Sequence, residues 1–348
     1  MSSKSGNAMM AKVLCLYGRR LKESDYNILL QKHSVAEIVE YLKDNTVYAS
    51  GLGEVKGELV RRGLLESLIN RFVWDTYLRL SKYDYDDKTI LRIFIKRNEI
   101  RQILLAVRLL NAGEMGRFIV TLPSYLANHM SVDLFKIAAA EDYDGLLSAV
   151  EKTPYYRILG RFRPIGGDAK IDIKALETSL LTHYYTEALA YIEKKYDGNT
   201  KLALKSILFY EIDLHNVNVI YRMKRYFNSA SKTAAANLIG IRARLSKKTY
   251  GAMLGAGDYK EALRIFKEQS MVMGAISSPG CPAEQFSSML HRVTHRFSKR
   301  ALRFSTQPVV VIFAYTALLE IEALNLINII EGVRYGVNPD QVRDLLVI

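Results

Sequence analysis

The sequence predicts an all-α protein, and three observations support this. Apolar residues make up 49% of the 348 residues and recur at helical spacing along almost the whole chain. Only seven prolines interrupt them, which is few for this length. A motif placed on helices also recurs three times, as described below. A chain of this length is expected to form two or three domains.

The charge balance and the cysteines limit the functional classes. Lys and Arg total 49 against 36 Asp and Glu, a net charge of +13, which favours an anionic partner such as nucleic acid, a lipid surface or an acidic protein. Cys15 and Cys281 are the only cysteines, so we expect a reducing compartment rather than a disulfide framework. The longest apolar run, Val309 to Leu319, reaches about half of a bilayer span. We therefore expect a soluble protein, compatible with work beside a membrane.

The segment from Glu211 to Phe227 predicts an amphipathic helix with one anomalous residue. At 100° per residue, Asn216 falls on the apolar side, in line with Val219, Ile220 and Met223. A carboxamide there is costly unless it is hydrogen-bonded. Its position therefore predicts a specific role.

The same combination of a carboxylate and an amide three residues later occurs at three places. The second amide follows the first by 114 residues and the third follows the second by 109. In each case an apolar stripe continues from the amide along the same helix face. The three pairs are Glu99 and Gln102, Asp213 and Asn216, and Glu322 and Asn325.

Further similarities keep this period. Residues 141–150 resemble residues 257–266, and residues 33–42 occupy the equivalent place; residues 44–48 resemble residues 151–156. Several similarities that share one period and one order predict three copies of a helical unit of about 110 residues. Each copy is predicted to contain a helix–turn–helix, a connecting region and a long terminal helix.

The predicted boundaries follow from this repeat. The three units are residues 1–114, 115–228 and 229–348. Breaks at residues 162–168 and 277–282 lie inside units and predict loops between helices rather than domain linkers.

Two interpretations of the amides remain open. A buried Asn or Gln usually satisfies backbone groups of a neighbouring segment and fixes its register. The alternative is direct contact with a partner. On the stripes opposite the amides lie four candidate partner contacts, for which the alternative is a solvated basic face. These are Arg101, Arg108, His215 and Arg222.

This threefold motif on helices rich in Ile, Leu and Val resembles the C/d subunit family of rotary V/A-type ATPases. Residues 18–48 look like the opening of that family and residues 320–348 look like its ending, so the resemblance covers essentially the whole chain. Two positions depart from the pattern: Gln102 replaces the usual Asn, and Glu331 stands where Arg or Lys is common.

The resemblance implies three similar helical domains around a pseudo-threefold axis, forming a funnel. Such a protein sits at the cytoplasmic face of the membrane, on the rotor ring, and receives the end of the central shaft. It would be a non-catalytic central-stalk adapter in ion transport or ATP synthesis. It would take no cofactor, nucleic acid or small-molecule substrate, and would reach the membrane only through the ring.

Other chemistry has little support. No phosphate-binding Gly-x-x-x-x-Gly-Lys-Ser/Thr loop is present, and residues 51–57 only loosely resemble a dinucleotide fingerprint. His291 and His295 share a helix face, but their basic setting disfavours a cation and predicts a solvated or partner-facing surface. Cys281 has no evident base. The alternatives are a basic helical-repeat protein that binds nucleic acid, disfavoured because the positive residues are scattered, and an unrecognised enzyme.

Overall fold

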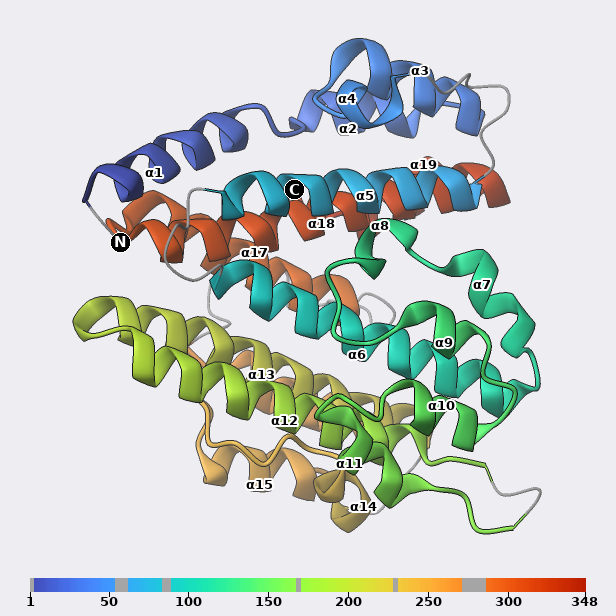
Figure 1. The fold of residues 1–348 in the computed structure, drawn as a ribbon. Coiled ribbons are helices and arrows are strands. Elements are labelled where there is room, and N and C mark those ends of the chain that lie inside the picture. Colours follow the sequence, from blue (N-terminus) through green and yellow to red (C-terminus); the bar gives the residue numbers. More distant parts are fainter. Residues whose placement is uncertain (1–2, 54–61, 83–88, 167–169, 228–230, 271–285) are drawn as a thin grey trace. The chain divides into compact units, whose positions relative to one another are not determined.

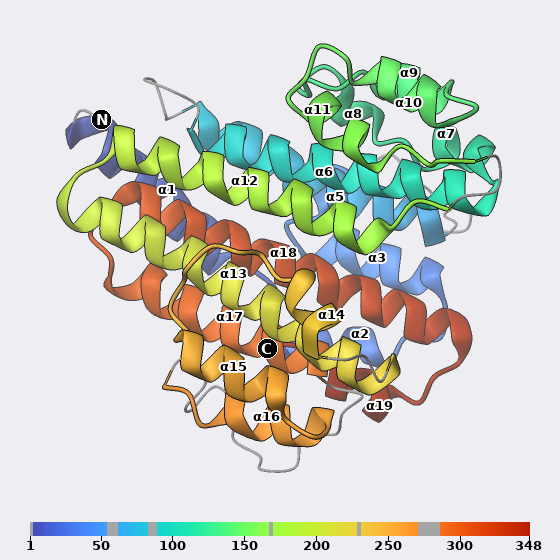
Figure 2. The ribbon, with the colours of Figure 1, turned by 90° about the horizontal axis from the view of Figure 1, so that it is seen from below.

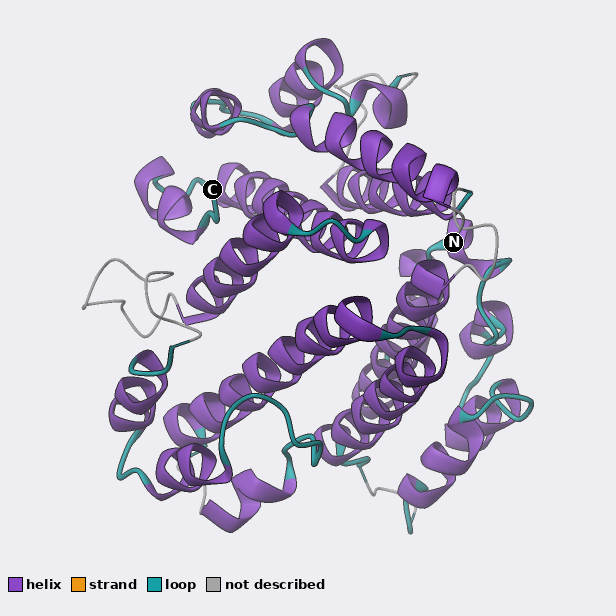
Figure 3. Ribbon diagram, turned by 90° about the vertical axis from the view of Figure 1, so that its left-hand side faces the viewer, coloured by secondary structure: helices purple, strands orange, loops and turns teal. Residues whose placement is uncertain are grey.

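The described part of the chain contains helices as its only regular elements. The computed structural model describes residues 3–53, 62–82, 89–166, 170–227, 231–270 and 286–348, and no strand occurs in these ranges (Figure 1, Figure 3). The predicted all-α class is therefore confirmed. Of the predicted loops, residues 277–282 lie outside the described residues, as do parts of residues 51–57 and 162–168.

Pairs of consecutive long helices are separated by groups of shorter ones. The α-helices are α1 (Ser3–Gly18), α2 (Glu23–Leu30), α3 (Val35–Asn45), α4 (Ala49–Leu52), α5 (Arg62–Ser81), α6 (Thr89–Ala112), α7 (Phe118–Thr121), α8 (Ser124–Ala127), α9 (Leu134–Ala138), α10 (Tyr143–Ala149), α11 (Tyr155–Leu159), α12 (Ile173–Lys195), α13 (Gly198–Tyr226), α14 (Ser231–Ala236), α15 (Lys247–Gly255), α16 (Tyr259–Lys267), α17 (Phe286–Phe304), α18 (Pro308–Tyr335) and α19 (Pro339–Leu345). Within the described ranges, 3₁₀ turns span Met115–Arg117 and Gly160–Phe162.

The chain divides into two compact units. Unit 1 combines Met1–Leu91 with Lys267–Ile348, and unit 2 is Arg92–Phe266. The helices α6 and α16 lie almost entirely in unit 2. The division into three sequence copies stays a prediction, but unit 1 already shows that the two ends of the chain fold together.

Unit 1 is built around α18. This helix contacts α1, α2, α3, α5, α17 and α19 and is buried along most of its length. It is longer than the apolar run Val309–Leu319 suggested. By length and hydropathy α18 could cross a membrane, yet 78% of its most apolar window is buried inside the protein. Because its apolar side chains pack against six other helices, we assign α18 as the core helix of unit 1.

Local signals at both ends define α18. Pro308 occupies its first turn, where a missing N–H costs nothing. At the other end Gly336 adopts a left-handed conformation with φ of 63°, and the Val337 N–H donates to the Gly332 carbonyl at 2.9 Å. This is the geometry of a Schellman termination.

Unit 2 contains the long helices α6, α12 and α13. The helices α12 and α13 pack against each other as a hairpin (Figure 2). Ion pairs tie α6 to both of them: Lys96 contacts Glu187 on α12, and Arg97 contacts Glu211 on α13 at 2.5 Å. The short helices α9, α10 and α11 follow one another in contact, and α14 contacts both α13 and α15.

Three short helices begin at the places that the sequence repeat marks as equivalent. The Glu37 N–H donates to the Ser34 hydroxyl at 3.2 Å at the start of α3. The Gly145 N–H donates to Asp142 at 2.8 Å at the start of α10, and the Glu261 N–H donates to Asp258 at 2.8 Å at the start of α16. Side-chain N-caps of this kind contribute about 1 kcal/mol each.

Candidate functional site

The three repeat carboxylates lie in the interior of the protein. Glu99 is 2% exposed, and Asp213 and Glu322 are fully buried. Each lies on a long helix, and each receives hydrogen bonds from a distant segment of the same unit. A buried carboxylate requires such partners, because an ionised group without them costs several kcal/mol.

Glu322 on α18 binds the N-terminal segment of the chain. Its Oε2 accepts a hydrogen bond from the Leu21 backbone N–H at 3.1 Å and from the Arg20 Nε at 3.0 Å. Its Oε1 accepts from the Tyr48 hydroxyl at 3.0 Å. Burial raises the pKa of Glu322, while Arg20 and the hydrogen bonds oppose the shift.

Asp213 on α13 has the same kind of partners. Its Oδ2 accepts from the backbone N–H groups of Arg244 at 2.9 Å and Leu245 at 3.0 Å. Its Oδ1 accepts from the Tyr250 hydroxyl at 2.7 Å. Burial raises the pKa of Asp213, and the hydrogen bonds from Tyr250 and the two backbone groups oppose this shift.

Glu99 on α6 completes the set. Its Oε1 accepts from the Ser131 backbone N–H, and its Oε2 accepts from the Tyr155 hydroxyl at 2.7 Å. Burial and the nearby Glu99 raise the pKa of Tyr155, so the phenol remains a donor at neutral pH. We refer to these three arrangements as the carboxylate latches.

In all three latches the backbone N–H donor lies just before the start of a short helix. Leu21 and Leu245 each stand immediately before the N-cap residue of a short helix, α2 or α15, and Ser131 stands two residues before the N-cap of α9. Each carboxylate thus holds the start of a short helix against a long one.

Two of the amides form a second connection. Asn216 donates to the Ile239 carbonyl at 3.1 Å and accepts from the Ile239 N–H at 2.8 Å. Asn325 donates to the Val347 carbonyl at 2.8 Å and accepts from the Val347 N–H at 2.9 Å. The bonded residues lie 23 and 22 positions after the amide. This is the backbone pairing that the structural interpretation of the amides requires.

Gln102 behaves differently from the two asparagines. Its Oε1 is buried and, among the described residues, has no hydrogen-bond partner. The longer side chain moves its amide by one methylene, so the pairing made by the asparagines is not reproduced. A paired amide in this part of unit 2 is provided instead by Asn111, which donates to the Ile171 carbonyl at 2.9 Å and accepts from its N–H at 3.0 Å.

The four candidate partner contacts are not one cluster of exposed charges. Arg101, Arg108 and Arg222 are exposed, whereas His215 is half-buried on α13. Burial lowers the pKa of His215, with Lys174 acting in the same direction and Glu177 opposing it. The role of these four residues as partner contacts stays a prediction.

Sequence reasoning missed the tyrosines of the latches. A signal existed for two of them, because Tyr48 and Tyr155 each stand two residues after a threonine in the segments 44–48 and 151–156. The tyrosine of the Asp213 latch, Tyr250, does not follow a threonine in this way. It is the fourth residue of α15, the place that Tyr26 occupies in α2. The phenol therefore approaches the carboxylate from a different helix in this latch.

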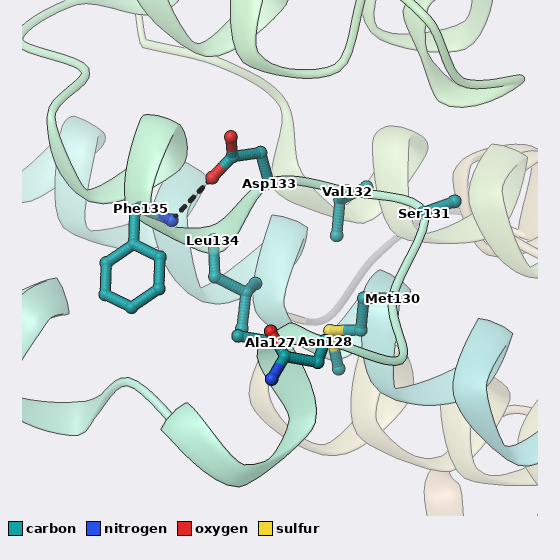
Figure 4. A pocket seen from close by; sticks show the side chains of 8 residues that line it. All are labelled: Ala127, Asn128, Met130, Ser131, Val132, Asp133, Leu134 and Phe135. Carbon is teal, nitrogen blue, oxygen red and sulfur yellow. Dashed lines mark hydrogen bonds between the residues drawn. The ribbon is translucent and has the colours of Figure 1, made fainter.

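A surface hollow of about 300 Å³ lies next to the Glu99 latch. It is lined by Ala127, Asn128 and Met130 to Phe135, and Figure 4 shows that the Phe135 ring and the Asp133 carboxylate point to different sides. Asp133 accepts from the backbone N–H groups of Phe135 and Lys136 at 3.1 Å each, so it caps α9. The lining brings together no acid, base and nucleophile.

The described residues contain no group of three or more His, Cys, Asp or Glu that could hold a metal ion. His291 and His295 are half-buried rather than solvated, because one side of α17 packs on α18. Burial lowers the pKa of both, that of His295 to about 4, so neither carries a charge at neutral pH. Cys15 is a free, exposed thiol, and Cys281 lies outside the described residues.

Comparison of the sequence with known proteins connects the chain to one class, the C subunits of A-type ATP synthases. The chain is 22% identical over 346 residues to the C subunit of the A-type ATP synthase of Methanosarcina mazei, covering 97% of this chain and 92% of that protein. It is 24% identical to the protein of the same name from Methanosphaera stadtmanae and 25% identical to that from Archaeoglobus fulgidus. These two alignments span 62% of this chain and 53% and 60% of those proteins.

The similarity at the level of the family covers nearly the whole chain. Residues 9–345 match the family described as ATP synthase (C/AC39) subunit. The chain belongs to this family. All six residues of the carboxylate and amide pairs lie inside the matched range.

Proposed function

We propose that this chain is the non-catalytic central-stalk adapter of a V/A-type rotary ATPase, which couples the central shaft to the membrane rotor ring. The observation that carries the proposal is the family match over residues 9–345, together with relatives that are named as the C subunit of A-type ATP synthases. In this role the protein transmits torque during ion transport or ATP synthesis and performs no reaction itself.

The internal construction supports such a role. A protein that transmits torque has to resist shear between its helices. Each latch joins a long helix to a segment 32 to 301 residues away by a backbone hydrogen bond to a buried carboxylate. Closely packed interiors with directional polar contacts deform little, so these connections favour rigid modules.

The remaining features of the proposal concern placement. The adapter would contact the shaft and the ring, lie at the cytoplasmic face of the membrane, and reach the membrane through the ring. The arrangement of three similar domains around a pseudo-threefold axis, with a funnel that accepts the shaft, belongs to the same proposal. The large buried share of α18 supports a peripheral position, because this helix is used for the core of unit 1.

The decisive experiment is co-purification. The full chain, produced together with the central shaft subunit and the rotor ring, is expected to bind each of them at low and moderate salt. The isolated chain is expected to show no ATP hydrolysis. If the chain is folded by circular dichroism but does not bind the shaft, or does not bind the ring, the proposed function is rejected.

A further inference from the structure

The helix α17 carries one sign of charge on one face. It contains Arg292, Arg296, Lys299, Arg300 and Arg303 and no acidic residue. At 100° per residue these five side chains fall within an arc of about 100°. From first to last they span about 16 Å along the helix axis. We call this set the α17 basic stripe.

The stripe is presented on a firmly held helix. The face of α17 turned away from the exposed arginines is buried, with Leu290, Ser298 and Leu302 at most 8% exposed, and α17 packs along α18 (Figure 2). The buried face therefore fixes the rotation of the helix about its axis. The side chains of Arg296, Arg300 and Arg303 are consequently exposed at defined spacing, while Arg292 and Lys299 are half-buried.

The cations of the stripe are not neutralised within the described residues. Arg296, Arg300 and Arg303 are exposed, and no carboxylate of the described chain forms an ion pair with them. Arg292 donates to the Asp344 carbonyl at 2.9 Å, which orients it without cancelling its charge. Five like charges on one helix face repel one another, and an anionic partner would relieve this cost.

The chemistry of the stripe favours a protein partner. Four of the five cations are arginines, whose planar guanidinium groups bind carboxylates in bidentate geometry. The exposed arginines follow the i, i+4, i+7 spacing, which a second helix with Asp or Glu at the same spacing would match. Phe304, 78% exposed at the end of the stripe, adds the kind of aromatic contact that anchors protein interfaces. A lipid surface would favour several insertable apolar side chains, and α17 exposes this one.

We infer that the α17 basic stripe is the docking surface for an acidic helix of the central shaft. This inference rests on the proposed function and assigns one partner of that function to one surface. The shaft is chosen over the ring because a row of cations along a rigid helix matches another helix lying alongside it. Phe304 would cover the end of the contact and exclude water from it.

The test measures binding of the full chain to the purified shaft subunit by biolayer interferometry at 50, 150 and 300 mM salt. The stripe variant is Arg296→Glu, Arg300→Glu and Arg303→Glu combined. The matched control is Lys194→Glu, Lys247→Glu and Lys248→Glu, which changes the same charge at exposed positions of unit 2. Melting temperatures verify that both variants are folded.

The stripe variant is expected to bind the shaft about 10- to 100-fold more weakly than the unmodified chain at 50 mM salt, mainly through slower association. The control is expected to change affinity less than about threefold, since distant exposed charges are screened. Phe304→Ala is expected to accelerate dissociation without changing the salt dependence, because it removes an apolar contact.

Other outcomes separate the inference from the proposed function. If the unmodified chain binds no shaft, the proposed function fails. If it binds and the stripe variant binds equally well, the docking surface is wrong while the function stands. If instead the stripe variant loses binding to phosphatidylserine vesicles or to duplex DNA while shaft binding is unchanged, the partner is a lipid surface or a nucleic acid, and the inference is overturned.

Discussion

Glu322 and Leu21 lie 301 residues apart in the sequence, yet the Leu21 backbone N–H donates a hydrogen bond to the Glu322 carboxylate at 3.1 Å. The first helices of the chain thereby complete a latch on the last long helix. The same kind of latch forms locally around Glu99 and Asp213, with partners 32 residues further along in each case. The third latch therefore closes the two ends of the chain onto each other.

The first prediction concerns this closure. Glu322→Leu removes the acceptor for three donors, of which Leu21 and Tyr48 are buried, and the free energy of unfolding is expected to fall by about 3–5 kcal/mol. Glu322→Gln keeps the shape but puts an amide NH₂ group, which is a donor, in place of one accepting oxygen, and is expected to cost about 1–3 kcal/mol. Urea denaturation measures both. Glu141→Gln, at an exposed position, serves as the control and should remain within about 0.5 kcal/mol of the unmodified protein.

The second prediction ranks the three amides. Asn216→Leu and Asn325→Leu each leave a buried backbone N–H and carbonyl unpaired, and each is expected to cost about 2–4 kcal/mol. Gln102→Leu removes an amide whose buried oxygen has no partner in the described chain, so its cost should stay below about 1 kcal/mol. Thermal unfolding of the three variants checks the order. An equal cost at all three positions would contradict the difference between Gln102 and the asparagines.

The third prediction concerns pH. The pKa of His295 is lowered to about 4 by burial, with Arg20 and Lys299 adding to the effect. The unfolded chain therefore binds a proton that the folded chain does not, between about pH 6.5 and pH 4. This contribution to stability is present above about pH 6.5 and is lost as the pH falls toward 4.

His295→Gln is expected to remove part of this slope. The free energy of unfolding, measured in urea from pH 4 to pH 8, should depend less steeply on pH in the variant than in the unmodified protein. His33→Gln, which changes an exposed histidine, serves as the matched control. Parallel curves for His295→Gln and the unmodified protein would show that His295 does not titrate differently on folding.

The fourth prediction concerns the packing of α18 on α19. A Cβ on Gly332 would lie 2.4 Å from Val342 Cγ2, so Gly332→Ala is expected to cost about 1–3 kcal/mol despite the higher helix propensity of alanine. The same Gly332→Ala substitution made in a Val342→Ala background should cost less, because the clashing methyl groups have been removed. Gly251→Ala in α15 meets no atom within 4 Å and should stabilise the protein by about 0.4–1 kcal/mol. Calorimetry measures all four variants.

The sequence alone was sufficient to predict the helical class and to show the recurring carboxylate and amide pairs. Helix formation depends on neighbours within a few residues, so apolar spacing and the few prolines were sufficient to predict an all-α chain. The carboxylate and amide pairs were visible for the same reason, because three-residue spacing places both side chains on one side of a helix. Their recurrence also pointed to the family that the comparison confirmed.

Only the tertiary structure decided which groups satisfy these side chains. The partners of Glu322 and Asn325 are backbone groups, a guanidinium and a phenol supplied by other segments, and a backbone N–H has no sequence signature. Tyr250 reaches Asp213 from a helix other than the one its counterparts use, and Gln102 misses the pairing by one methylene. Hydrogen bonding depends on positions within a few tenths of an ångström, and those positions are set when the helices pack.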